Sequence, residues 1–123
     1  MPNSEGLPIY IDTYHLAQDV FADTVSFPRD YKFILGTRLN NDVLDLCCLI
    51  DRINRADDKD DLLDMFISGL ERVRIQLRLC ADFKLIGFQR QAGLAEMIEK
   101  IWTQAVAWQK SERRRQKSVP ESG

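Results

Sequence analysis

Four stretches of helical periodicity, separated by three short breaks, dominate this sequence. Apolar residues recur at spacings of three and four over about residues 9–26, 31–55, 60–85 and 88–111, and no segment alternates like a β-strand. Only four prolines and six glycines occur among the 123 residues, so the stretches are almost uninterrupted. Long amphipathic helices joined by short connections predict an all-α domain, an antiparallel up-down-up-down four-helix bundle.

Local signals define the expected ends of these helices. Pro28 lacks an amide proton and cannot continue the first helix, whereas the aspartates of residues 57–61 favour the start of the third. Gly87 is expected to stop the third helix. The bundle is therefore predicted to occupy residues 9–111, between a flexible tail at 1–8 and a basic flexible tail at 112–123.

Three of the helices are expected to present one apolar face each. On the first helix this face comprises Tyr10, Tyr14, Ala17, Phe21 and Val25. On the second it comprises Leu35, Leu39, Val43, Leu46, Ile50 and Ile53. On the fourth it comprises Leu94, Ile98, Ile101, Trp102 and Ala105, with Trp108 as a further candidate.

The third helix differs because its apolar residues fall on two nearly opposite sides. One stripe is predicted to enter the core: Leu63, Phe66, Leu70, Val73, Leu77 and Ala81. The other stripe consists of Met65, Arg72, Ile75, Leu79 and Phe83. A single bundle buries one stripe per helix, so the second is either a scatter of surface side chains or an oligomer interface. We favour the interface, because contiguous exposed apolar surface usually marks a partner.

Charge is unevenly distributed along a chain whose net charge is −2. Residues 1–64 contain thirteen acidic and six basic side chains, whereas residues 65–123 contain six acidic and eleven basic ones. Arg74 and Arg78 lie on the flank between the two apolar stripes. They either form ion pairs with Glu71 and Asp82, three and four residues away, or they meet an anionic partner.

The basic segment near the C-terminus allows two interpretations. It is either a solubilising end or a source of sequence-independent affinity for nucleic acid. Its cations are Arg113, Arg114, Arg115 and Lys117.

Enzymatic function finds little support in the sequence. The single histidine, His15, has no partner pattern for catalysis, and the acidic segment 57–61 lacks the glycine and glutamate of a calcium-binding EF-hand loop. Three cysteines, Cys47, Cys48 and Cys80, are expected to be buried free thiols. We therefore expect no catalytic residue, metal or cofactor. Because neither a signal peptide nor a membrane span is recognisable, we expect a cytoplasmic location.

Three ordered segments carry a resemblance to a known family. "SFPRDYKFILGTRL", "LERVRIQLRLCADFKLIGFQR" and "AWQKS" follow one another as in the accessory variability determinant proteins of diversity-generating retroelements. The resemblance covers about residues 9–111. It extends to the related bundles encoded in intervening sequences of bacterial 23S ribosomal RNA genes.

The resemblance implies a non-catalytic homopentameric barrel that binds a reverse transcriptase and its template-repeat RNA during mutagenic cDNA synthesis. Arg78 and Arg38 match recurrent basic positions of the family, whereas Arg74, Lys84 and Arg90 join the expected binding surface on charge and helix position alone. The alternative is a self-associating bundle of the ribosomal-RNA-insert type that has no reverse-transcriptase partner.

Overall fold

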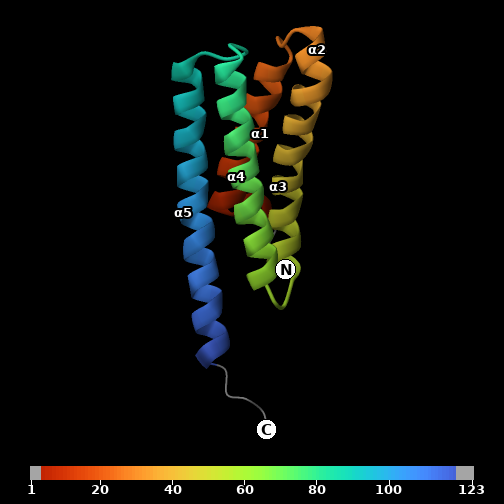
Figure 1. The fold of residues 1–123 in the computed structure, drawn as a ribbon. Coiled ribbons are helices and arrows are strands. Elements are labelled where there is room, and N and C mark those ends of the chain that lie inside the picture. The colour runs from red at the N-terminus through yellow and green to blue at the C-terminus, as the bar shows by residue number, and fades with distance from the viewer. Residues whose placement is uncertain (1–3, 119–123) are drawn as a thin grey trace.

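The computed structural model of this protein describes residues 4–118, except for the side chain of Ser118, and that part contains helices but no strand. Four long helices lie side by side as a bundle (Figure 1). They are α1 (Pro8–Thr24), α3 (Thr37–Arg55), α4 (Asp60–Asp82) and α5 (Phe88–Ser118). The all-α prediction is confirmed.

Each long helix contacts two others. α3 packs against α1 and α4, and α5 packs against the same two helices on the other side. The predicted core stripe of α4 is buried throughout, as are the five residues of the α3 stripe that follow Leu35. The largest fully buried side chain is that of Phe66.

The expected core face of α1 is wrong for three of its five residues. Tyr14, Phe21 and Val25 are exposed, whereas Ala17 is buried and Tyr10 is partly buried against the core. The helix also turns toward the core Ile9, Thr13, Leu16, Val20 and Thr24. Both threonines tolerate burial because each hydroxyl donates to a carbonyl of its own helix, Thr13 to Ile9 over 2.7 Å and Thr24 to Phe21 over 3.0 Å.

The second helix begins earlier than expected and includes an irregular turn. The short helix α2 (Arg29–Tyr31) follows Pro28 directly, and a π-helical segment (Lys32–Gly36) joins it to α3. Two large apolar residues of this segment lie in solvent, Phe33 at 67% exposure and Ile34 at 78%. π-Helical turns within α-helices often occur at functional sites, so this end of the bundle is a candidate contact surface.

α4 ends at Asp82, before its expected end at about residue 85, and Gly87 is not the residue that stops it. The amide of Leu85 donates to the carbonyl of Cys80, and the amide of Lys84 donates to that of Ala81. This pair of bonds is a Schellman motif, and its left-handed position is occupied by Lys84 with a φ of 61°. The helix therefore stops at a residue that sequence preference does not favour there.

Both predicted tails are partly ordered. A 3₁₀ turn (Ser4–Gly6) precedes α1, and the buried Ser4 donates to Asp51 over 2.9 Å. α5 continues to Ser118, beyond its expected end at residue 111. Residues 1–3 and 119–123, which also belong to the predicted tails, lie outside the described residues. Within residues 4–118, no helix is both long and apolar enough to cross a membrane.

Candidate interaction surfaces

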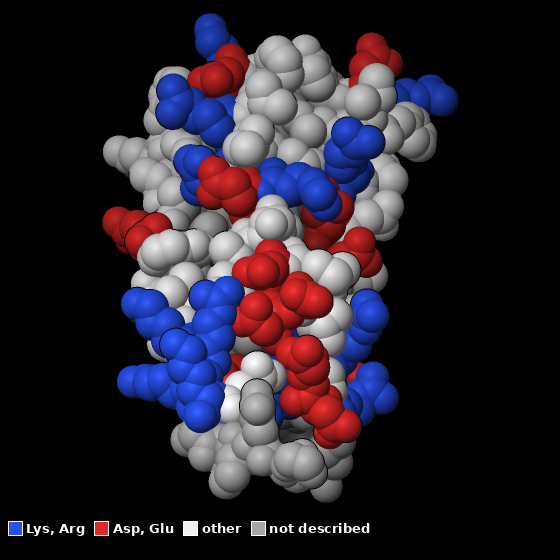
Figure 2. All heavy atoms as spheres, turned by 60° about the horizontal axis from the view of Figure 1, so that its bottom comes forward, with Lys and Arg blue, Asp and Glu red and all other residues white. Residues whose placement is uncertain are grey.

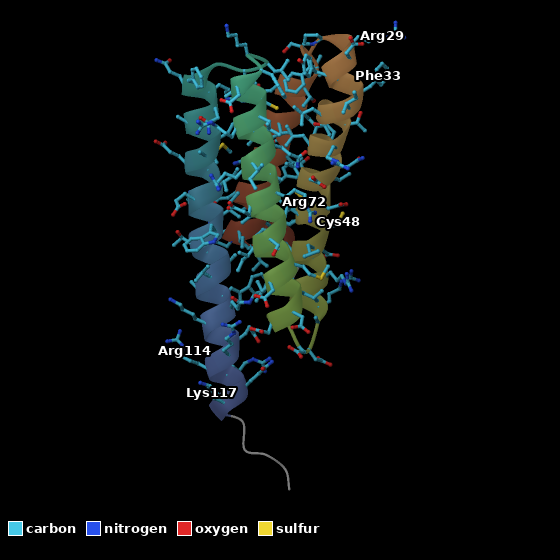
Figure 3. The ribbon with its side chains drawn as sticks, in the orientation of Figure 1. Arg29, Phe33, Cys48, Arg72, Arg114 and Lys117 are labelled. Atoms are coloured by element: carbon cyan, nitrogen blue, oxygen red, sulfur yellow. The ribbon has the colours of Figure 1, made fainter. Side chains whose placement is uncertain are left out.

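The outer stripe of α4 lies on the surface of the single chain, as its helical spacing predicts. Its four apolar members, Met65, Ile75, Leu79 and Phe83, are 41–52% exposed. Arg72 is exposed among them and lies over the α3–α4 side of the bundle (Figure 3).

Residues of α3 complete this surface. Met65 and Arg72 line a shallow groove together with Asp42, Asp45 and Leu49 of α3. At the far end of α4, the ring of Phe83 lies 5.4 Å from that of Tyr31 in α2. The stripe therefore borders α3 near Met65 and Arg72 and borders α2 at Phe83.

The exposed apolar surface is wider than the sequence analysis predicts. Of the fourteen exposed large hydrophobic residues in the described part of the chain, twelve precede α5. Ten of the fourteen were not predicted to be exposed: Ile11, Tyr14, Phe21, Val25, Tyr31, Phe33, Ile34, Leu44, Phe88 and Trp102. A second groove, between α1 and α3, includes Tyr10, Tyr14 and Leu44. On a helical wheel, the apolar residues of α1 fall in two stripes, as those of α4 do. The sequence therefore already indicated a second apolar surface on α1.

Two of the predicted binding arginines form ion pairs on their own helix. Arg74 donates from Nε to Glu71 Oε2 over 3.0 Å and also from its second terminal nitrogen to Glu71, and this bonding lowers the pKa of that carboxyl. Arg78 lies 3.4 Å from Asp82 Oδ1. Both pairs are exposed, and such pairs contribute little to stability. The ion-pair interpretation of these arginines is therefore confirmed, which leaves their role toward a partner a prediction.

Arg90 is also engaged, but with another helix. Its Nε donates to Asp23 of α1 over 2.8 Å, and Asp19 lies 3.8 Å from a terminal nitrogen. The hydrogen bond to Asp23 raises the pKa of the guanidinium. This arginine joins α5 to α1.

Arg38 and Lys84 complete the predicted set of cations. Both are exposed, and neither has an ion-pair partner among residues 4–118. The five cations do not meet on one surface: Arg74 lines a groove with Trp102 of α5, Arg90 faces α1, and Arg38 lies on α3. Trp102, expected in the core, is 42% exposed in that groove.

The end of the molecule that contains the α3–α4 connection and the last turns of α5 carries an unexpected arrangement of charge. Figure 2 shows acidic side chains gathered in the middle of this end, with basic ones on both sides. Arg113 of α5 lies 2.6 Å from Asp60, Gln109 donates to Asp64 over 2.6 Å, and Arg115 contacts the carbonyl of Asp57 at 3.4 Å. The basic segment predicted as a tail is therefore a helix docked on the acidic α3–α4 connection.

Carboxylates at this end lie close enough together to attract a cation. Oxygens of Asp60, Asp61 and Asp64 lie within 4.8 Å of one another. Two of the three already accept hydrogen bonds from Arg113 and Gln109. The cation that these carboxylates meet in the structure is the protein's own arginine.

The three cysteines differ in their surroundings. Cys47 and Cys80 are buried, and burial raises the pKa of each thiol to about 11. Cys48 is exposed on α3, contrary to the expectation that all three are buried (Figure 3).

No model of a protein family matches the chain, and a search of curated proteins gives no significant match.

Proposed function

We propose that this protein is a non-catalytic accessory factor of a diversity-generating retroelement, which binds the reverse transcriptase and its template RNA and supports mutagenic cDNA synthesis. The resemblance in three ordered sequence segments is the source of this assignment. The observation that carries it is the apolar stripe Met65, Ile75, Leu79 and Phe83, which lies outside the bundle core. A chain with such a surface fits an assembly better than a solitary domain.

The proposed assembly is a homopentameric barrel of antiparallel up-down-up-down bundles. Short connections support the antiparallel arrangement, since only four residues separate α3 from α4 and five separate α4 from α5. The stripe of α4 would be covered by a sister subunit. The stem of Arg72 packs within this contact while its guanidinium stays in water.

The cations are proposed to act through repetition around the ring. Arg74 and Arg78 are exposed and only loosely committed to Glu71 and Asp82, because exposed ion pairs exchange readily for a stronger anionic partner. Arg38 and Lys84 add unpaired charge. Several copies of such flanks combine into a basic band that RNA phosphates can bridge.

Co-purification tests this proposal directly. The tagged chain is co-expressed with a reverse transcriptase encoded beside it, and recovered protein and RNA are measured at moderate salt. Arg74→Glu with Arg78→Glu is expected to abolish recovery without changing helicity or mass. Arg55→Glu with Lys100→Glu is the matched control, because it also inverts two exposed, ion-paired cations. Equal recovery from both variants would contradict the assigned surface.

One observation favours the second candidate, a self-associating bundle without a polymerase partner. Three of the five predicted binding cations, Arg74, Arg78 and Arg90, already pair with acids of the same chain. Genomic neighbourhood separates the candidates. A reverse-transcriptase gene beside paired near-identical repeats fits the retroelement, whereas a location within a ribosomal RNA gene fits the alternative.

A further inference from the structure

We propose that the end of α5 is a phosphate-binding ridge, on which Lys110, Arg114 and Lys117 follow the backbone of single-stranded nucleic acid. The inference rests on the proposed function for the choice of RNA as the natural ligand. It assigns a role to the last turns of α5, where Arg114 and Lys117 lie beyond the residues that the resemblance covers.

The three cations form one row. Spacings of four and three residues place them on the same face of α5, and all are exposed. At 1.5 Å rise per residue the row spans about 10 Å, which matches three steps of ~3.4 Å between successive phosphates of a stacked strand. Arg114 and Lys117 extend from the side of α5 that faces away from α4 (Figure 3).

No member of the row is neutralised within the protein. Lys110, Arg114 and Lys117 have neither an ion pair nor a side-chain hydrogen bond in the described part of the chain. The inward side of the same turns carries the buried Gln109 and Glu112. The arginines beside it are paired, Arg113 with Asp60 of α4 and Arg115 with Glu112 of α5 over 3.0 Å.

These contacts turn one basic segment into two functionally different faces. The inner face anchors the helix end where it projects beyond the α3–α4 connection (Figure 1), and the outer face presents positive charge in a fixed direction. A disordered tail of the same composition would lose conformational entropy on binding. The docked helix has already lost it, which favours binding to the row.

The chemistry of the ridge selects a phosphodiester chain over other anionic partners. Residues 110–117 include no apolar side chain, so the ridge has neither the apolar centre of a protein interface nor the apolar face of a membrane-bound helix. Point charges at regular spacing suit a ligand whose affinity comes from counterion release.

The test is fluorescence anisotropy with a labelled 20-nucleotide single-stranded RNA of mixed sequence, titrated with full-length protein at 50–200 mM salt. For Arg114→Gln with Lys117→Gln, the magnitude of the slope of log affinity against log salt is expected to fall by about 1.4, since each lost phosphate contact accounts for ~0.7. The matched control, Arg113→Gln with Arg115→Gln, removes equal charge from the same turns. Its slope is expected to change by less than half as much, because Arg113 and Arg115 pair with Asp60 and Glu112, whose carboxylates are much less exposed than those that hold Arg74 and Arg78.

Three outcomes overturn the ridge: equal slope changes in the two variants, no change in the first, or wild-type protein that binds phosphatidylserine vesicles but not the RNA. Circular dichroism monitors the helix end. If the control pair unfolds it, Arg52→Gln with Arg55→Gln on α3 replaces that control.

Co-purification with the reverse transcriptase reports separately on the proposed function. Intact co-purification with an unchanged RNA slope refutes the ridge alone. If Arg114→Gln with Lys117→Gln lowers the RNA slope as expected but the wild-type chain does not co-purify with the reverse transcriptase, only the retroelement assignment is refuted.

Discussion

Arg113 Nε donates to Asp60 Oδ1 over 2.6 Å, and this ion pair joins the last turns of α5 to the first turn of α4. The partners are separated by 53 residues in sequence, and the nearby carboxylate raises the pKa of the guanidinium. Gln116 adds a contact to Asp58 at 3.4 Å. These contacts explain why a segment with the composition of a tail is helical.

Replacing Asp60 with asparagine is expected to loosen the end of α5 and leave the rest of the bundle intact. The change removes the charge that holds Arg113, so amide hydrogen exchange over residues 112–118 should accelerate. Asp61→Asn is the control, because Asp61 lies on the same turn but has no ion-pair partner among the described residues. Equal acceleration in both variants would show that net charge, rather than this contact, orders the segment.

Gly93→Ala is expected to stabilise the protein by about 1 kcal/mol, because glycine is a poor helix former and Gly93 lies exposed within α5. An added Cβ meets nothing within 4 Å there. Gly69→Ala provides the contrast, since its Cβ would lie 2.9 Å from Cδ2 of the buried Leu46. Urea unfolding at one fixed protein concentration should show a gain for Gly93→Ala and a smaller gain, or a loss, for Gly69→Ala.

Lys84→Gly should also stabilise the fold, by roughly 1 kcal/mol, because Lys84 adopts a φ of 61° that glycine adopts without steric cost. Lys84→Ala removes the same charge but keeps a Cβ in the left-handed conformation, so it should give no comparable gain. Thermal unfolding distinguishes the two. A similar increase from both substitutions would attribute the effect to charge instead of backbone strain.

One thiol per chain is expected to react with a chromogenic disulfide reagent at pH 8, and three after denaturation. Burial raises the pKa of Cys47 and Cys80 to about 11, so both stay protonated and inaccessible at that pH. Cys48 is exposed and should account for the native reaction. Cys48→Ser should abolish it, and a fast reaction that persists in this variant would mean that the bundle opens.

The sequence predicts the elements of this fold better than the orientation of each helix. Periodicity locates the four long helices, and the aliphatic stripes of α3 and α4 identify their core faces correctly. On α1 the large aromatic residues suggested the wrong face. Threonine in a sequence predicts neither a buried nor an exposed position. The hydrogen bonds to carbonyls that allow Thr13 and Thr24 into the core become visible only in the structure.

The candidate surfaces were predictable to the extent that they depend on one helix. The exposed stripe of α4 and the pairs Arg74–Glu71 and Arg78–Asp82 follow from spacing within a helix. Contacts between distant segments, such as Arg90 with Asp23 and Arg113 with Asp60, depend on packing that no local pattern specifies. The same holds for Lys84, whose conformation sequence preference opposes.

The solution mass of the particle, measured by light scattering during size-exclusion chromatography, tests the central claim most directly. The wild-type chain should elute as a multiple of its 14.3 kDa mass, and Ile75→Glu with Leu79→Glu should give soluble, helical monomers. Phe88→Glu with Trp102→Glu alters two exposed apolar residues of α5 outside the stripe and should keep the wild-type mass. A wild-type particle of 14.3 kDa, or an unchanged mass for the α4 variant, would contradict the assignment of this face to a subunit interface.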